Sequence, residues 1–283
     1  ETAEKLASQH LVEECMIATN RCAARFLNER NASGPYVTHP GFRSDRLDET
    51  RKFLDMHAPQ AAQQDPKTVE GYRSIIRALS QPEQELPLRT MVNRLLTRAE
   101  LTVKPAPHMG MALEHYTNCT SPLRKYVDFL VHLQIKAALH DDEAKMVDDQ
   151  LLKDLSSRIA SARAATLEAE RWLASKHLAR MSAQREGMTF KARVTHVNSS
   201  GFTVRLDDNG LSGFVDLRKD PEKFSYDKWT ASLTSTTRRF QLDKPVELRF
   251  IGVDRDNQYQ ASFELVEGCG LKPPKEEKKT AAE

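Results

Sequence analysis

YTNCTSPLRKYVDFLVH, residues 116–132, is the segment of this chain that says most about its fold. It opens with a polar turn around Pro122, and from Leu123 onward its apolar residues recur at the spacing of a helix. Pro122 suits the first turn of a helix, where its missing N–H costs nothing, and Thr120 or Ser121 can cap the free amides. The segment therefore predicts a turn that leads directly into a helix.

Arg124 and Lys125 fall on the first turn of this predicted helix, beside backbone N–H groups that lack partners within the helix. Helix starts of this kind bind phosphate oxygens, and an arginine side chain adds two parallel hydrogen bonds. On physical grounds alone, the simpler interpretation is an ordinary capped helix with two surface cations. The pattern of residue types favours a more specific interpretation.

The sequence TSPLRKY, followed by Asp128 and His132, resembles the TSP-[IL]-R-[RK]-Y signature of the RNase II/RNase R family of 3′-to-5′ exoribonucleases. Upstream, residues 107–110 (PHMG) and 113–116 (LEHY) resemble the family's lead-in to that signature. In the family, the arginine of the signature contacts the phosphate next to the scissile bond. The resemblance therefore implies that Arg124 is catalytic. It also implies RNA-binding positions at Tyr116, Thr120, Ser121 and Lys125.

Residues from about 3 to 30 are predicted to form one helix with a wide, buried apolar face. That face is expected to comprise Leu11, Val12, Cys15, Met16, Ala18, Cys22, Ala23, Phe26 and Leu27. The segment LVEECMIATN resembles a family helix in which a glutamate hydrogen-bonds the sugar hydroxyls of the 3′-terminal nucleotide. The resemblance implies that Glu13 has this role, whereas a hydrogen-bonded glutamate at the edge of the core is the simpler alternative. A carboxylate that accepts from a 2′-hydroxyl would favour RNA over DNA, so DNA is not an expected partner.

The segments between and after these two helices are predicted to be largely structural. Short helices are expected at about 44–57, 66–79 and 88–98, short strands at 101–105 and 108–113, and a long helix from 149 to about 184. An acidic cluster precedes the long helix: Asp141, Asp142, Glu143, Asp148 and Asp149. Carboxylates on a turn can hold Mg²⁺, but nothing spaces these around one ion, so a solvated turn is the better interpretation.

At Gly187 the apolar residues change from a helical period to alternation, which predicts a domain boundary at about 184–187. Five strands with an Asn209-Gly210 hairpin turn, and a helical or irregular insert before the fourth strand, resemble an S1-type OB fold. OB folds stack bases on aromatic side chains while cations follow the backbone. The candidates for RNA binding are Arg193, His196, Phe202, Arg205 and Phe214. Each could equally be a core aromatic residue or a surface charge.

The expected fold class is therefore α+β. Residues 1–184 are assigned to the C-terminal part of the family's catalytic (RNB) domain, which is mostly helical with short strands. Residues 187–268 are assigned to a five-stranded S1-like OB β-barrel, and residues 269–283 to a tail that is disordered by composition.

The composition of the 283 residues excludes few classes of protein. The formal net charge is +2, and the four cysteines do not have zinc-site spacing. No apolar run approaches 18 residues, so a soluble, cytoplasmic protein without a membrane partner is expected. The chain begins Glu-Thr-Ala-Glu, without an initiator Met, and is expected to be a C-terminal fragment.

Two departures from the family pattern concern single residues. Cys119 stands where the family usually has an aromatic residue, and Leu133 where a second arginine often follows the histidine. A third departure concerns the metal site. The family requires Mg²⁺, but its ligands are a loop of aspartates that is expected to lie outside this chain, so no metal ligand is assigned here.

Two-metal hydrolysis needs carboxylates to hold the ions. The parent protein is therefore expected to be a processive exoribonuclease that hydrolyses single-stranded RNA to nucleoside 5′-monophosphates, and this chain alone is expected to be inactive. Its expected partners are single-stranded RNA and the N-terminal half of the same protein. The alternative is a non-catalytic protein that binds single-stranded RNA. A purely helical interaction scaffold would leave the TSPLRKY motif unexplained.

Overall fold

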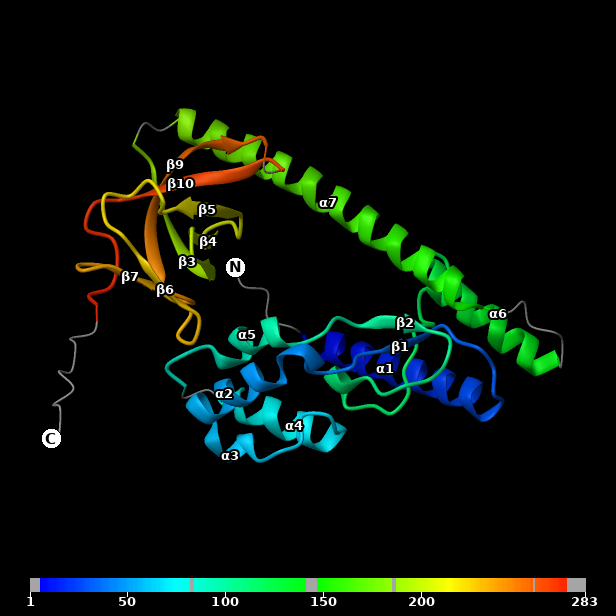
Figure 1. Ribbon diagram of the computed structural model, residues 1–283. Helices are drawn as coiled ribbons and strands as arrows, with labels where there is room; N and C mark the ends of the chain where they lie inside the picture. The colour runs from blue at the N-terminus through cyan, green and yellow to red at the C-terminus, as the bar shows by residue number, and fades with distance from the viewer. Residues whose placement is uncertain (1–5, 82–83, 141–146, 185–186, 257, 274–283) are drawn as a thin grey trace, which may run out of the picture. The chain divides into compact units, whose positions relative to one another are not determined.

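The computed structural model describes residues 6–81, 84–140, 147–184, 187–256 and 258–273 (Figure 1). The chain divides into two compact units, which are treated separately below. The first comprises residues 1–82 and 88–161, and the second comprises residues 83–87 and 162–283. The division falls within α7 (Asp149–Gln184), so both units include part of this helix. Among the helices of the described segments, none is both long and apolar enough to cross a lipid bilayer.

The core of the first unit lies where α1 (Ala7–Glu29) meets α6 (Tyr126–His140). Ala24 and Leu27 of α1 are fully buried against Val131 of α6, together with Tyr36 and Cys119. Elsewhere on α6, Val127 and Leu130 pack against Leu155 in the first turns of α7. The motif helix is therefore held by apolar contacts with both α1 and α7, which makes it a rigid support for the turn that precedes it.

The chain between α1 and α6 forms short elements. They are β1 (Tyr36–Thr38), η1 (Ser44–Arg46), α2 (Leu47–His57), α3 (Pro59–Ala62), α4 (Val69–Ala78), α5 (Leu88–Val92), η2 (Asn93–Leu95), β2 (Glu100–Thr102) and η3 (Met109–Met111). β1 and β2 form a two-stranded antiparallel sheet. The predicted strand at 108–113 is wrong: Met109–Met111 is a 3₁₀ turn, and Ala112 has a left-handed φ of 54° that no strand allows.

The prediction that α1 is buried along its whole apolar face is also wrong. Leu11, Val12 and Met16 are 67%, 57% and 41% exposed, and Cys15 and Cys22 are exposed as well. Only the C-terminal half of the helix, from Asn20 onward, is buried. The spacing of apolar residues identifies the face that can be buried, but it does not supply an element to cover that face.

The second unit is built on a closed five-stranded barrel with the order β10-β5-β4-β3-β9. The strands are β3 (Thr189–Asn198), β4 (Gly201–Leu206), β5 (Ser212–Asp216), β9 (Pro245–Asp254) and β10 (Gln260–Leu265). The pairs are antiparallel except β10 with β5, which is parallel. A Cβ at Gly213 would overlap the ring of Phe263, so glycine is required where this parallel pair closes the barrel. The predicted α+β class and five-stranded barrel are confirmed.

The sequence predicts a helical or irregular insert before β9, and this prediction is wrong. The insert is a small antiparallel sheet. Its strands are β6 (Ser225–Asp227), β7 (Ser232–Thr234) and β8 (Arg239–Gln241). Leu233 and Phe240 are buried within it. The backbone of Arg239 exchanges two hydrogen bonds with Leu271, at 2.7 and 2.9 Å. The predicted start of the disordered tail at residue 269 is therefore too early, and residues 274–283 lie outside the described segments.

Candidate nucleic-acid interface

Arg124, the arginine of the signature, lies in the motif turn, which comprises residues 120–125. The backbone N–H groups of Arg124 and Lys125 both donate to the carbonyl oxygen of Ser121, at 3.3 and 3.0 Å, and α6 begins only at Tyr126. Arg124 and Lys125 therefore precede the helix instead of lying on its first turn, which corrects the sequence-based expectation. Their side chains are exposed to solvent. Because their amides are already used within the turn, anion binding there depends on the two side-chain cations.

Three polar side chains hold this turn and the residue before it. Asn20 of α1 accepts hydrogen bonds from the backbone N–H of Cys119, at 2.8 Å, and from its thiol, at 3.3 Å. The Nε2 of His132 lies 2.7 Å from the carbonyl oxygen of Cys119, which can only accept, so this nitrogen carries the proton. Asp128 accepts from the backbone N–H of Ser121 at 2.9 Å. Contacts from α1 and α6 thus fix the backbone next to Arg124.

Tyr116 is buried among contacts inside the first unit, and its assignment to RNA binding stays a prediction. Its side chain is 8% exposed, and its hydroxyl accepts a hydrogen bond of 2.9 Å from the amide of Asn20. Its ring packs edge-on against His108, with 5.6 Å between the ring centroids. Thr120 and Ser121 are half-buried, and an RNA contact by either remains a prediction.

The thiol of Cys119 is buried where the family pattern usually has an aromatic residue. The residue is 7% exposed and belongs to the core that α1 and α6 share. Burial raises the pKa of the thiol, and the nearby charge of Asp128 raises it further. Cys119 therefore offers neither a stacking surface nor a reactive thiolate to a ligand at the motif turn.

Glu13 lies on α1 seven residues before Asn20. Seven residues are two helical turns, so the two side chains share one face of α1, roughly 10 Å apart along the helix axis. Glu13 is half-buried, and its carboxylate is 3.9 Å from the imidazole of His10. The structure places Glu13 on the helix face that carries the motif contacts, and its bond to a sugar hydroxyl remains a prediction.

A pair of histidines lies beside Tyr116. The rings of His39 and His108 are stacked, with 5.4 Å between their centroids and an interplanar angle of 24°. Burial lowers the pKa of both histidines. The ring of His108 therefore packs against both His39 and Tyr116 inside the first unit.

The polar residues that sequence reasoning missed are Asn20, Asp128 and His132. Asp128 and His132 belong to the motif, but nothing in the sequence showed which backbone groups they would reach. Asn20 gave a weaker signal, because it is a polar residue next to an otherwise apolar face. Each contact joins residues that only the fold brings together.

Phe202, one of the two aromatic residues proposed to stack on RNA bases in the barrel, is fully buried. It is 0% exposed and packs against Phe240 with 5.0 Å between ring centroids, so its assignment to RNA binding is wrong. Phe214 points outward from β5 and is half-buried. Thr203 and Ser262 are its neighbours on the two adjacent strands. Of the two rings, only that of Phe214 has a face that a base could reach.

Arg193 and Arg205 lie directly opposite each other on β3 and β4, and both side chains are exposed. Arg193 donates to the carbonyl oxygen of Asp243 at 3.2 Å. Like charges at opposite positions of a sheet destabilise it. Pro245 and Ser212 flank the pair in the same row of the barrel, so no carboxylate in this row offsets the repulsion. A phosphate group bound between the two guanidinium groups would offset it.

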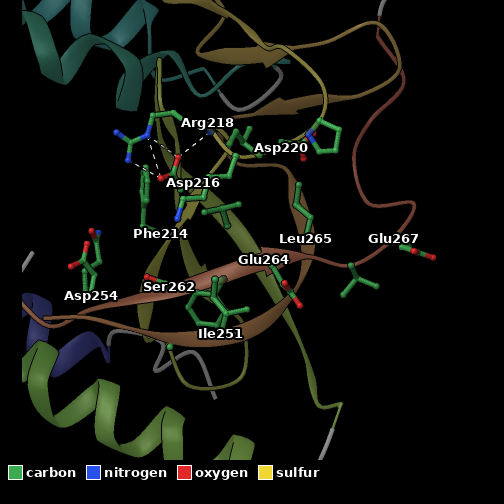
Figure 2. Close-up of a pocket in the computed structure, with 18 of the residues that line it drawn as sticks. Phe214, Asp216, Arg218, Asp220, Ile251, Asp254, Ser262, Glu264, Leu265 and Glu267 are labelled. Atoms are coloured by element: carbon green, nitrogen blue, oxygen red, sulfur yellow. Dashed lines mark hydrogen bonds and ion pairs between the residues drawn. The ribbon is translucent and has the colours of Figure 1, made fainter.

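Phe214 also lines a pocket of about 770 Å³ between β5, β9 and β10 (Figure 2). Figure 2 shows Asp216 and Arg218 on one side of its ring, and Ser262 and Ile251 on another. The acidic residues of the lining are Asp216, Asp220, Asp254, Glu264 and Glu267. The cations of the lining are Arg218, Lys219 and Arg238.

Two of these three cations are already paired. Arg218 contacts Asp216 at 2.7 Å, and its hydrogen bond lowers the pKa of that carboxyl. Arg238 contacts Asp220 at 2.6 Å and Glu222 at 2.9 Å. Hydrogen bonds from Ser235 and Thr237, together with Arg238, lower the pKa of Glu222 to about 2. The pocket therefore suits an uncharged base better than a phosphate.

The described residues do not form a metal site. Nowhere among them do three or more His, Cys, Asp or Glu side chains lie close enough to hold an ion. Residues 141–146, which include most of the acidic cluster, lie outside the described segments. Asp148 accepts a hydrogen bond from the backbone N–H of Leu151 at 2.7 Å. That carboxylate caps the start of α7, which is a structural role.

Comparison with known proteins assigns both parts of the chain to domain families. Residues 1–141 match the RNB domain, and residues 183–262 match the S1 RNA binding domain. Exoribonuclease 2 of Serratia proteamaculans is 34% identical over 215 residues, which cover 76% of this chain and 33% of that protein. The chain thus spans about a third of the length of this relative.

Several solved structures share the fold, and two of them are informative here. The apo form of Mycoplasma genitalium RNase R matches with a TM-score of 0.72 and 19% identity, over 93% of this chain and 42% of that one. Yeast Ssd1, described as a pseudonuclease, matches with a TM-score of 0.58 and 19% identity, over 80% of this chain and 29% of that one. The same fold therefore occurs in a protein named as a nuclease and in one named as a pseudonuclease.

Proposed function

Because the chain belongs to the RNB family and also carries an S1 RNA-binding domain, we propose that it is part of a 3′-to-5′ exoribonuclease. Its substrate would be single-stranded RNA, degraded processively to nucleoside 5′-monophosphates. The observation that carries this proposal is Arg124, exposed on a turn that buried polar side chains hold in place. The relatives named Exoribonuclease 2 support the same reaction.

Arg124 would act on the phosphate group that is cleaved. Its guanidinium can donate two parallel hydrogen bonds to non-bridging phosphate oxygens. When water attacks phosphorus and the bond to the leaving 3′-oxygen breaks, negative charge builds up on these oxygens, and a fixed cation stabilises it. Lys125 would attract the neighbouring phosphate as a less directional charge.

Mg²⁺ supplies, in this family, the means to activate water and to stabilise the leaving oxygen. The described residues do not fit such an ion, since they contain no suitable group of ligands. We therefore assign the metal ligands to another part of an RNB domain, on the N-terminal half of the same protein. This chain alone would bind RNA without cleaving it.

Exposed apolar side chains support a polypeptide partner of that kind. On α1, Leu11 and Val12 are 67% and 57% exposed, and on α6, Tyr126 and Phe129 are 56% and 43% exposed. α1 and α6 pack against each other, so these side chains belong to one unit. Tyr126 and Phe129 also lie close together, with 6.0 Å between their ring centroids. Exposed apolar side chains of this size support a site that another polypeptide covers.

The S1 domain would hold RNA upstream of the cleaved end. A base would stack on Phe214 in the pocket, and the phosphates would pass over Arg193 and Arg205 instead of the acidic pocket rim. In the first unit, Glu13 would accept a hydrogen bond from a 2′-hydroxyl, which would favour RNA over DNA.

A second candidate function is a non-catalytic protein that binds single-stranded RNA. The observation in its favour is that the described residues lack a group able to hold a metal ion. In this case Arg124 and the S1 domain would contribute only to affinity.

Incubation of a 5′-labelled single-stranded RNA with the chain and Mg²⁺, analysed on a denaturing gel, tests these proposals. We expect that this chain alone does not shorten the RNA, and that it binds the RNA with an affinity that Arg124→Ala weakens. Lys136→Ala, which removes an exposed cation further along α6, is the matched control and should bind as the unmodified chain does. A ladder that EDTA and Arg124→Ala both abolish would support the nuclease but contradict the assignment of the metal ligands to a partner. Absence of both cleavage and binding would overturn both candidate functions.

A further inference from the structure

Asp128 is a buried carboxylate next to the motif turn. It is 1% exposed, and it is the third residue of α6, near the positive end of the helix dipole. Its Oδ2 accepts the hydrogen bond from Ser121, whereas its Oδ1 has no hydrogen-bond partner among the residues that the structure describes. A buried carboxylate with one unpaired oxygen is costly for a fold. Its presence therefore calls for a compensating role.

The hydrogen bond from Ser121 to Asp128 lies at the start of a short chain of contacts. Asp128 holds the backbone N–H of Ser121, and the carbonyl oxygen of Ser121 in turn accepts from the N–H groups of Arg124 and Lys125. The two backbone groups of Ser121 thus connect a buried side chain to the two residues that carry the exposed cations. Loss of the acceptor would leave the N–H of Ser121 without its partner and free the turn to adopt other conformations.

The neighbouring contacts fix only the residue before the turn. Asn20 and His132 both act on the backbone of Cys119, two residues upstream of Ser121. Of the three polar side chains, Asp128 alone contacts the motif turn itself. It is also too deeply buried to touch RNA, so any effect on RNA has to pass through the turn.

We propose that Asp128 is the positioning residue of the motif turn: by holding Ser121, it fixes the backbone from which Arg124 reaches a phosphate of the RNA. The inference rests on the proposed role of Arg124. It requires a hydrogen-bond acceptor at position 128 and no direct contact between Asp128 and the RNA.

The test compares Asp128→Ala with Asp128→Asn in the whole chain, with a fluorescently labelled single-stranded oligo(A) RNA as the probe. Asp128→Ala and Arg124→Ala should each weaken binding about tenfold, the size expected for one charged hydrogen bond. Each should also flatten the plot of log affinity against log salt concentration by about 0.7, the loss of one phosphate contact on a single strand. Asp128→Asn keeps a carbonyl oxygen that can accept from Ser121, so it should restore both values.

A double-mutant cycle separates positioning from general damage to the fold. If Asp128 acts through Arg124, then Asp128→Ala should cause no further loss of affinity in an Arg124→Ala chain. The proposal would be overturned if the losses of RNA affinity from the two substitutions add in the double variant. It would also be overturned if Asp128→Asn loses as much affinity as Asp128→Ala. If Arg124→Ala itself changes neither affinity nor salt dependence, the proposed function of Arg124 fails instead, whatever Asp128 does.

Thermal unfolding of each variant is the control for folding. If Asp128→Ala does not fold, Ser121→Pro removes the same hydrogen bond from the donor side and leaves the carboxylate in place. A folded Ser121→Pro chain that binds RNA with the unmodified affinity and salt dependence would also overturn the proposal.

Discussion

Asn20 and Cys119, which are 99 residues apart in the chain, share two hydrogen bonds in the core of the first unit. The Oδ1 of Asn20 accepts from the backbone N–H of Cys119 at 2.8 Å and from its thiol at 3.3 Å. The same side chain donates to the hydroxyl of Tyr116 at 2.9 Å. One amide group therefore connects α1 to both ends of the segment that precedes the motif turn.

Replacement of Asn20 by Ala should destabilise the first unit. It would leave the backbone N–H of Cys119 buried without a partner and remove the donor to Tyr116, so we expect a loss of about 2–4 kcal/mol in the free energy of unfolding. Urea denaturation would measure it. Thr19→Ala, at the adjacent exposed position of α1, is the control and should stay within about 0.5 kcal/mol of the unmodified chain. A similar small effect for Asn20→Ala would contradict the structural role of this contact.

Acidification should destabilise the same unit through His39 and His108. Burial lowers the folded-state pKa of both below the ordinary value of 6.5, so between the folded and unfolded values the unfolded state binds more protons. Their contribution to stability is present above pH 6.5 and is lost as the pH falls through the folded-state values. Urea denaturation of the unmodified chain at a series of pH values would measure this slope. His108→Gln should make it shallower, and an unchanged slope in that variant would contradict the assignment to His108.

Substitutions at Phe202 and Phe214 should affect different properties: the first should lower folding stability, and the second should weaken RNA binding. Phe202→Ala removes a fully buried ring and should cost about 3–5 kcal/mol of folding stability. Phe214→Ala should cost much less stability but should weaken binding of single-stranded RNA by about 1–3 kcal/mol, the range for one stacked base. Thermal unfolding and fluorescence anisotropy would measure the two effects. Unchanged RNA affinity in Phe214→Ala would remove this ring from the interface.

Arg205→Ala should weaken RNA binding and slightly stabilise the barrel. The substitution removes repulsion from Arg193 on the opposite strand, worth about 0.2–1 kcal/mol, and removes one cation from the proposed phosphate path. The salt dependence of RNA affinity should flatten by about 0.7. Arg218→Ala is the matched control: this arginine is already paired with Asp216, so its loss should leave the salt dependence unchanged. The opposite result would place the RNA backbone at the pocket rim.

Much of the barrel could be predicted from sequence, because alternation of side chains along a strand is a local property. The same alternation could have separated the two phenylalanines. Phe202 shares its face of β4 with Val204 and Leu206, which are buried, whereas Phe214 lies between Gly213 and Val215, which are both buried, and so belongs to the opposite face of β5. The insert could not be predicted as well, since its three-residue strands are too short to show a pattern.

The candidate site was predicted in part. The motif identified Arg124 and Lys125 as exposed cations, and the structure agrees. Sequence reasoning assigned the capping of the turn to the hydroxyls of Thr120 or Ser121, but the described contact runs from the backbone of Ser121 to Asp128, seven residues ahead. The burial of Tyr116 likewise depends on Asn20, which lies on another helix. Contacts between distant segments are set by the fold and leave little trace in local spacing.

The buried thiol of Cys119 can report local unfolding of the segment before the motif turn. A thiol reagent attacks the thiolate, and a buried side chain with a raised pKa presents almost none, whereas Cys15 and Cys22 are exposed. In a chain whose other three cysteines are replaced by serine, modification of Cys119 would have to wait until the contact with Asn20 breaks. The rate of that modification would then measure how often the segment before the motif turn leaves its folded position, without any substitution at the motif turn itself.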